Sequence, residues 1–182
     1  MLKRSLTALF AVVVIVGTAS AAEPKSGPQV GDKVVPFHPL NCTGDHAGEK
    51  YCLICQNGPN PVAMIFARHV SPELTRLIKR LDQATDKYKE RSMGSFVVFL
   101  NDSETLEKEL KELAPRERIQ HCILTIDHPD GPGGYNIAQE ADVTVVLYTM
   151  QTVKANHAFK KEELNDKDID AIVADLAKIL SE

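Results

Sequence analysis

The sequence predicts an α/β domain with a mixed central sheet and helices on both faces. Three observations predict it: short apolar runs at residues 62–66 and 96–100, helical spacing after each run, and a strand pair at 143–159 followed by an amphipathic helix. Alternating strands and helices imply parallel strands joined by crossover helices. The hairpin adds an antiparallel edge.

The first half of the domain is expected to begin with a short extended piece at residues 34–40, which two prolines confine to an edge or an open loop. Residues 62–66 are continuously apolar, as in a buried strand. The following helix, residues 71–91, has Ser71 as N-cap and Pro72 at its first position, a strong start signal.

The second half repeats the pattern after a strand at residues 96–100. We expect the following elements: a helix capped by Asp102 or Ser103 and stopped by Pro115, a strand at 119–126, one helical turn within 135–141, a hairpin of 143–148 with 152–159, and a last helix capped by Asp166.

Residues 1–22 have the pattern of a secretory signal peptide. Lys3 and Arg4 precede an apolar run at residues 6–17 that is too short to cross a bilayer, and small residues at 18–22 offer cleavage sites. We therefore expect an exported protein, periplasmic or secreted.

The exported chain is expected to hold a flexible leader at residues 23–29 and one domain at residues 30–182. Loss of residues 1–22 changes the formal net charge from −4 to −6. An acidic domain without tryptophan has no electrostatic basis for binding nucleic acid, and no membrane contact is expected after cleavage. In an oxidising compartment a pair of nearby cysteines is expected to rest as a disulfide.

Cys52 and Cys55 form a Cys-x-x-Cys pair, which is typical of thiol–disulfide redox proteins and of metal sites. The pair precedes the strand at residues 62–66, and the Gly/Pro-rich residues 56–61 predict a turn after it rather than a helix. No helix dipole is then expected to stabilise a thiolate. Cys52 is the expected attacking thiol because it lies nearer Lys50.

Two other interpretations of these cysteines stay open. Cys42, His46, Cys52 and Cys55 lie within fourteen residues, and their thiolates and imidazole could hold tetrahedral zinc or copper(I). The pair could instead be a structural disulfide. Cys122 lies inside an apolar run and is expected to be a small buried hydrophobic residue.

The order of elements resembles the thioredoxin-like superfamily, in particular its exported thioredoxin-like and peroxiredoxin-like branch. The resemblance covers residues 30–180 and includes these short motifs: VGD at 30–32, PF at 36–37, GEK at 48–50, LTID at 124–127 and YNI at 135–137. It implies a thioredoxin-like fold and thiol chemistry.

The chain departs from this family at two places. In its redox-active members the dithiol follows the first core strand and opens the next helix, whereas residues 68–72 here contain no cysteine and no peroxidatic pattern. The family's cis-proline before a threonine is replaced by Val143 before Thr144. The family's site residues therefore do not transfer to these positions.

Two functions are consistent with the sequence. The first is a thiol–disulfide oxidoreductase that acts through Cys52 and Cys55 on protein thiols, protein disulfides or a redox partner protein, with no cofactor. The second is a non-catalytic binding module in which the cysteines form a structural disulfide or a metal site. Exposure distinguishes them, because a redox pair needs one reachable sulfur.

Overall fold

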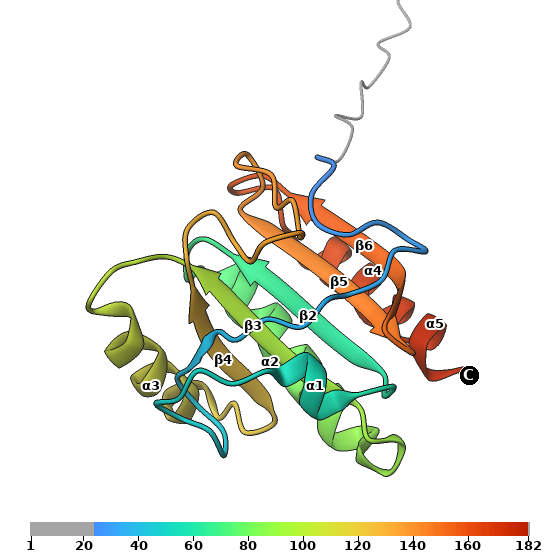
Figure 1. Cartoon of the computed structure of the whole chain (residues 1–182), viewed down its shortest axis with the longest axis horizontal. Coiled ribbons are helices and arrows are strands. Elements are labelled where there is room, and N and C mark those ends of the chain that lie inside the picture. The colour runs from blue at the N-terminus through green and yellow to red at the C-terminus, as the bar shows by residue number, and fades with distance from the viewer. Residues whose placement is uncertain (1–23, 182) are drawn as a thin grey trace, which may run out of the picture.

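The computed structural model describes residues 24–181, which form a six-stranded sheet with the order β1-β4-β3-β2-β5-β6 (Figure 1). β2, β3 and β4 are parallel neighbours, whereas β1, β5 and β6 each pair antiparallel. The mixed sheet with an antiparallel hairpin edge is therefore confirmed. The strands are β1 (Leu40–Asn41), β2 (Val62–Ala67), β3 (Gly94–Leu100), β4 (Cys122–Asp127), β5 (Val143–Thr149) and β6 (Thr152–Phe159).

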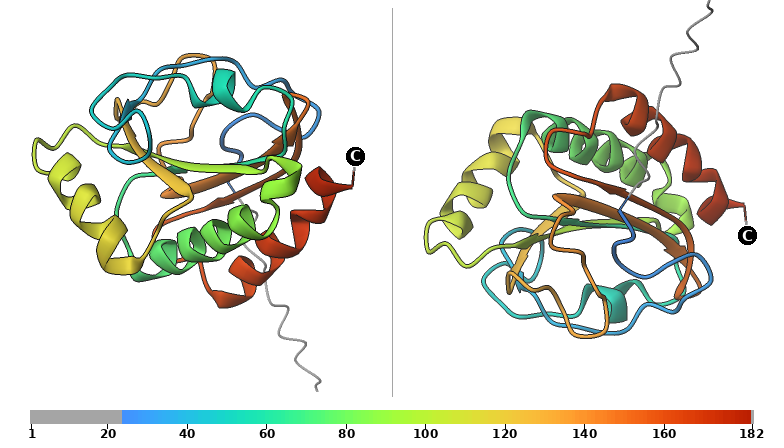
Figure 2. Two further views of the ribbon diagram at one scale, coloured as in Figure 1. Left: turned by 90° about the horizontal axis from the view of Figure 1, so that it is seen from below. Right: turned by 90° about the horizontal axis from the view of Figure 1, so that it is seen from above.

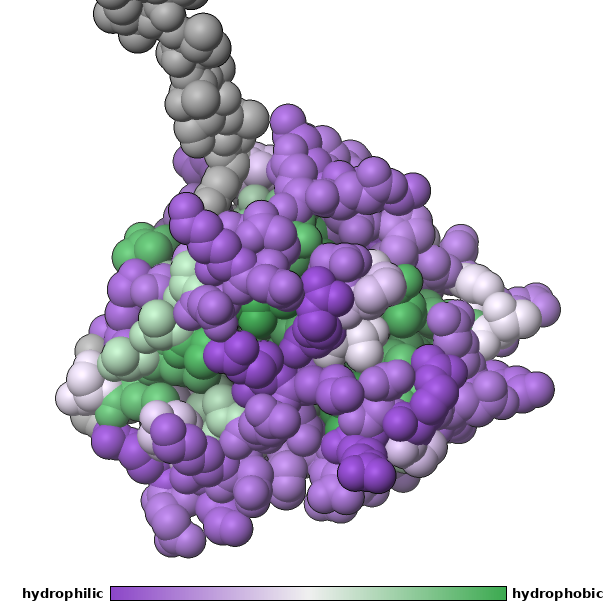
Figure 3. Space-filling view, turned by 180° about the vertical axis from the view of Figure 1, so that it is seen from behind, coloured by the Kyte–Doolittle hydropathy of each residue, from purple (hydrophilic) through white to green (hydrophobic). Residues whose placement is uncertain are grey.

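The two faces of the sheet are covered differently (Figure 2). One face carries the helices α2 (Pro72–Lys87), α3 (Leu106–Glu117), α4 (Asp166–Asp175) and α5 (Ala177–Leu180). The other carries the one-turn helix α1 (Leu53–Asn57) and irregular segments. Helices thus lie on both faces as expected. The helix-rich face is mainly hydrophilic outside, and hydrophobic side chains gather at its left side and in smaller areas elsewhere (Figure 3).

Alternation along the strands separates two hydrophobic cores. In β2, Ala63 and Ile65 pack under the four helices, whereas Met64 and Phe66 pack under α1 and the irregular segments. All six residues of β2 are buried. Burial on both faces explains why this strand is continuously apolar instead of alternating with polar residues.

The predicted start of α2 is confirmed: Ser71 Oγ accepts the backbone N–H of Leu74 at 3.1 Å. The cap of α4 is Asn165 and not Asp166, because the Asn165 side chain forms a capping box with Asp168.

The second crossover helix and the segment before β5 differ from expectation. α3 begins at Leu106 after Thr105, not after Asp102 or Ser103, and Pro115 lies inside its last turn instead of stopping it. The fixed backbone angle of proline is compatible with a helix, and α3 ends two residues after Pro115, at Glu117. The segment 135–141 contains no helix but has one hydrogen-bonded turn, in which the Ala141 N–H donates to the Ala138 carbonyl at 3.2 Å.

The segment expected to be a flexible leader is attached to the domain from Ser26 onward. Ser26 is buried, and its hydroxyl lies 2.7 Å from Thr144 Oγ1 and accepts the N–H of Ala138. Asn156 donates to the carbonyls of Ser26 and Pro28. The packed part of the chain therefore begins before residue 30. The Ser26 hydroxyl contacts β5 and the loop between β4 and β5, and the backbone carbonyls of Ser26 and Pro28 accept hydrogen bonds from β6. The predicted signal peptide, residues 1–22, lies outside the described residues.

Candidate functional site

Cys52 and Cys55 form a disulfide at the start of α1, with their Cα atoms 5.3 Å apart. Cys52 is the N-cap of this helix, and its Sγ accepts the backbone N–H of Cys55 at 3.1 Å. The predicted turn after the pair is confirmed only at residues 58–60, because residues 56–57 belong to α1. One helical turn forms because the Cys52 sulfur takes the place of a capping oxygen and Asn57 donates to the Leu53 carbonyl at 2.8 Å.

The two sulfur-bearing residues differ in exposure. Cys52 is 4% exposed and packs in the core under α1 with Leu53 and Ile54, whereas Cys55 is exposed. Our sequence-based choice of Cys52 as the attacking thiol does not fit this burial. A partner can reach Cys55 from solvent, and Cys52 lies behind it.

The disulfide lies on the face of the sheet opposite α2. The Asn57 side chain packs against Gly94, where an added Cβ would overlap it, so α1 ends at the start of β3. Figure 1 shows α1 crossing in front of the sheet. The pair is therefore displaced from the carboxyl end of β2, where the resemblance would place a dithiol.

Structural interactions occupy that carboxyl end. Arg68 donates to the backbone carbonyls of Pro129, Ala138 and Ala141 and so holds the loop before β5. His69 Nδ1 lies 2.6 Å from Asp142 Oδ1. Since Ser71 caps α2, the polar groups of this junction already have partners within the fold.

The four cysteine and histidine residues of the metal interpretation are not brought together. Cys42 packs in the core under the four helices, whereas Cys52 packs on the opposite face and is bonded to Cys55. His46 stacks on Tyr51, with ring centroids 3.5 Å apart. Within residues 24–181 no group of three or more His, Cys, Asp and Glu side chains is arranged to hold a metal ion.

Tyr51 directly precedes Cys52 but has no role in the functions expected from the sequence. Its ring lies on the His46 imidazole at an interplanar angle of 13°, so this stacked pair lies directly before the start of α1 in the chain. Sequence adjacency to the dithiol was the only available signal. Contact with His46 depends on the course of the loop between them.

The remaining cysteines, Cys42 and Cys122, are free and buried. Burial raises the pKa of each thiol to about 12, with a further increase from the charge of Glu107 at Cys42 and of Asp82 at Cys122. Nearby Lys111 and a hydrogen bond with Ser95 oppose these increases only in part. Because thiolates are the nucleophilic form, both are inert at neutral pH.

We expect alkylation to separate the cysteines. After reduction of the native protein at about pH 8, iodoacetamide should modify Cys55 first, and Cys42 and Cys122 only after unfolding in guanidinium. A pKa of about 12 instead of 9.0 lowers the thiolate fraction about a thousandfold. Peptide mass spectrometry after timed quenching measures the order. Labelling of Cys122 as fast as Cys55 would contradict it.

We also expect the folded state to lose stability in alkali. Burial raises the pKa of both free thiols and of the Tyr135 and Tyr148 hydroxyls, so the folded state favours their protonated forms. This stabilisation is fully present below the pKa values that the groups have in the unfolded chain, the lowest of which is about 9. It is lost as the pH rises toward 12. The raised pKa of Cys122 alone should lower the free energy of unfolding by on the order of 2 kcal/mol at pH 11.

Thermal melts between pH 7 and 11 measure this loss. Cys122→Ala is the matched variant, because it removes the titrating group and should flatten the decline. A melting temperature that stays constant up to pH 11 in the unmodified protein would refute the expectation.

Comparison with known proteins identifies the fold. An uncharacterized conserved protein from Geobacillus kaustophilus aligns with a TM-score of 0.66 at 14% identity, over 88% of this chain and 86% of that one. Peroxidoxin BcpB from Mycobacterium tuberculosis aligns with 0.59 at 16%, over 83% and 97%. Reduced 2-Cys peroxiredoxin from Plasmodium vivax aligns with 0.60 at 21%, over 80% and 82%.

No family model and no curated protein sequence matches the chain. The structural matches establish its class: it has a thioredoxin-like fold, similar to the peroxiredoxin structures, and it carries a Cys-x-x-Cys disulfide. Among residues 24–181 there is no helix with the length and apolar character needed to cross a bilayer.

Proposed function

We propose that this protein is an exported thiol–disulfide exchange protein in which Cys55 exchanges with partner thiols and Cys52 is the covered partner sulfur. One observation carries the proposal: the disulfide joins an exposed cysteine to a buried one that already accepts a backbone N–H. The names of the similar structures, a peroxidoxin and a 2-Cys peroxiredoxin, agree with thiol chemistry on this fold.

The exchange proceeds in two steps. A partner thiolate attacks Cys55 Sγ, the Cys52–Cys55 bond breaks, a mixed disulfide forms on Cys55 and Cys52 leaves as a thiolate. A second partner thiolate then attacks the partner's own sulfur and releases Cys55. The partner dithiol is oxidised to a disulfide, and two electrons reduce the protein pair.

The buried position of Cys52 favours attack on Cys55 over attack on Cys52. When Cys52 leaves, its sulfur already accepts the N–H of Cys55 at 3.1 Å. A hydrogen bond to a charged group contributes about 1.5–3 kcal/mol, so it stabilises the departing thiolate. Attack on Cys52 would instead displace Cys55, and the attacking group would have to enter the core.

A purely structural role is the second candidate, since α1 docks on the sheet beside the disulfide. The closed loop spans only three positions in sequence. A loop this short constrains the unfolded chain little and contributes about 2 kcal/mol. A structural disulfide also gains nothing from an exposed cysteine, so the exchange function is the better account.

The proposed export rests on the sequence pattern of residues 1–22. Expression of the full chain in a bacterial host, followed by mass measurement of the periplasmic protein, tests it. A processed protein that begins near residue 23 supports export. An unprocessed cytoplasmic protein overturns it.

The exchange function is tested by the reduction potential of the Cys52–Cys55 pair, measured by thiol trapping in graded glutathione buffers. A working pair should show a reversible two-electron transition between about −300 and −120 mV. The transition should vanish in Cys55→Ser. A disulfide that stays oxidised across the whole range would leave the structural role as the function.

A further inference from the structure

A cavity of about 530 Å³, open to solvent, lies on the helix-rich face of the sheet, opposite α1 and the disulfide. α2 and the short 3₁₀ helix η1 (Lys89–Arg91) form one wall, and the end of α4 with α5 forms the other. The first wall is lined by residues 80, 83, 84, 87, 88 and 91, whose spacing of three and four places them along one side of a helix. The helix rise gives this row a length of about 16 Å. The cavity is therefore an elongated groove between two helices.

The floor of the groove is apolar. Ala84, Leu176 and Leu180 are each at most 8% exposed, and Val173 and Tyr88 are partly buried against the same hydrophobic core. Figure 3 shows hydrophobic side chains gathered at the left of the view, on the side of the molecule where α5 lies. Apolar surface of this kind is stabilised when an apolar group covers it. The floor therefore suits a ligand with an apolar body.

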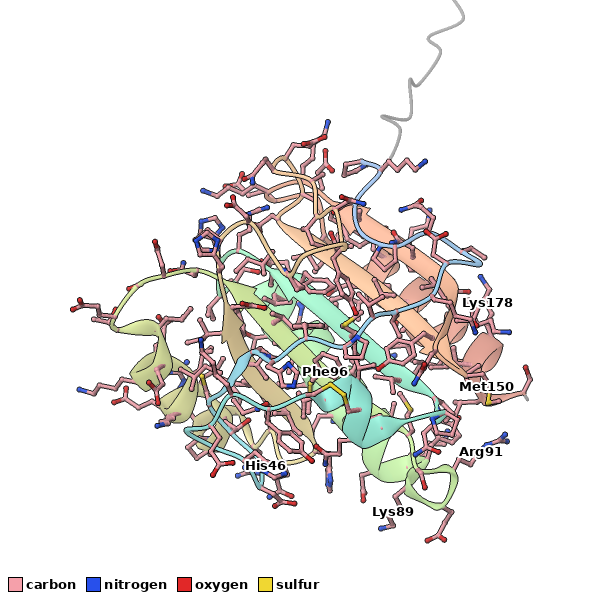
Figure 4. The ribbon with its side chains drawn as sticks, in the orientation of Figure 1. His46, Lys89, Arg91, Phe96, Met150 and Lys178 are labelled. Carbon is pink, nitrogen blue, oxygen red and sulfur yellow. A yellow bond between two sulfur atoms is a disulfide. The ribbon has the colours of Figure 1, made fainter. Side chains whose placement is uncertain are left out.

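The rim of the groove is basic. Its twelve lining residues include Arg80, Lys87 and Arg91 but no Asp or Glu, although the chain as a whole has 25 acidic and 21 basic residues. Figure 4 shows Arg91 on the same side of the molecule as α5. The charge of the rim therefore complements a ligand with an anionic group.

Lys87 is the cation best placed to meet that group. It forms no ion pair within residues 24–181, and its Nζ lies 5.0 Å from the centroid of the Tyr88 ring, which also lines the groove. Arg80, by contrast, already pairs with Asp170 at 3.0 Å. An anion at the end of the groove near Tyr88 therefore meets an ammonium group that has no carboxylate partner.

The size of the groove favours a small molecule over a protein partner. Stable protein interfaces use about 20–30 residues on each side, whereas twelve residues line this groove. A volume of about 530 Å³ lies within the range of small-molecule sites. A second copy of the chain, paired symmetrically, would also bring two sets of the same cations together. A flexible apolar chain with one anionic end complements both the floor and the rim.

We propose that this groove binds a long-chain carboxylate of the fatty-acid class. The alkyl chain lies along the apolar floor between α2 and α5, and the carboxylate pairs with Lys87 at the end of α2. Binding makes and breaks no covalent bond. The site lies on the face opposite the exchanging sulfur, so this inference does not depend on the exchange function.

Titration with sodium dodecanoate at about pH 8, below the concentration at which it forms micelles, tests the site. We expect saturable shifts of backbone amide signals at residues 80–91 and 173–181 of the oxidised, isotope-labelled protein. The affinity should rise about two- to fourfold for each CH₂ group added between octanoate and dodecanoate, because the floor covers each group partly or completely. No saturable shift up to about 5 mM, or shifts confined to other surfaces, would overturn the inference. Shifts at the same residues that follow the protein concentration without ligand would show that a second copy covers the groove, and would also overturn it.

The charge of the ligand provides a second test. Dodecyltrimethylammonium has the same chain with a cationic end and should bind at least about tenfold more weakly than dodecanoate. Lys87→Glu should weaken dodecanoate binding about three- to tenfold, because it replaces the carboxylate's partner with a repelling group. Lys108→Glu makes the same charge change on α3, which packs against β4 toward the other edge of the sheet from α5, and should leave the affinity within about twofold. Equal affinities of the two ligands, or equal effects of the two variants, would overturn the proposal.

Filling the groove tests its position. Ala177 is an exposed residue of α5 that lines the groove, so Ala177→Trp should fold normally and melt within about 3 °C of the unmodified protein. The tryptophan ring should occupy the floor and lower the affinity for dodecanoate at least about tenfold. Cys55→Ser, on the opposite face, should leave that affinity unchanged. Full affinity in a folded Ala177→Trp variant would show that the ligand lies elsewhere and would overturn the site.

Discussion

Replacing Cys52 with serine is expected to convert the protein into a trap that accumulates a mixed disulfide on Cys55. The variant retains the exposed Cys55 thiol, which attacks oxidised glutathione and releases one glutathione thiol. It lacks the buried sulfur that, in this reverse direction of exchange, attacks Cys55 Sγ and releases the second glutathione. Replacing Cys55 should instead lower the exchange rate by more than about a hundredfold, because the surviving thiol is covered by the core. Non-reducing gels and intact mass after mixing with an excess of oxidised glutathione measure the adduct.

Cys122→Ser serves as the matched control for this pair of variants. It also removes one buried sulfur, but it leaves the disulfide and α1 intact, so exchange should continue at the unmodified rate. An adduct that forms on Cys55→Ser and not on Cys52→Ser would reverse the assigned roles. If neither variant forms an adduct, the proposed exchange function is wrong.

Most of the sheet could be predicted because its signals are local. The continuous apolar run of β2 reflects burial on both faces, and the Ser71-Pro72 pair marks the start of α2 through a cap that forms within four residues. Features that depend on distant contacts were missed. Ser26 looks like part of a polar leader, but its hydroxyl is held by Thr144, more than a hundred residues away.

The short helix α1 and the end of α3 could not be predicted correctly from the sequence. α1 has five residues, which is too few for a helical period to appear, and its cap is a cysteine sulfur instead of an oxygen. Its Gly/Pro-rich continuation indicated a turn. Pro115 was expected to end α3, but the helix continues for two further residues, to Glu117.

The candidate site was predictable in composition but not in geometry. The spacing of Cys52 and Cys55 identified the pair, whereas its exposure depends on sheet residues that pack on Cys52 from elsewhere in the chain. The metal interpretation failed for a similar reason. Cys42 is close to Cys52 in sequence, but the chain crosses the sheet edge between them, so the two side chains pack on opposite faces.

Replacing Asp82 with alanine is expected to destabilise the fold by about 4 kcal/mol. Asp82 lies on α2 and is 7% exposed. Its Oδ1 accepts the backbone N–H groups of Gln120 at 2.9 Å, His121 at 2.6 Å and Cys122 at 2.8 Å, at the point where β4 enters the sheet. Alanine leaves three donors without their acceptor, one of them fully inside the core. Thermal melts should show a decrease of roughly 8–16 °C.

Two further variants separate the acceptor from general effects of helix substitution. Asp82→Asn keeps one oxygen in place but loses the charge, and since all three donors point to a single oxygen it should lose about half as much stability. Asp86→Ala, one turn later, removes only exposed ion pairs with Lys89 and His121 and should cost less than about 1 kcal/mol. If Asp82→Ala melts within about 3 °C of the unmodified protein, the three hydrogen bonds do not hold β4 to α2, and packing alone must do so.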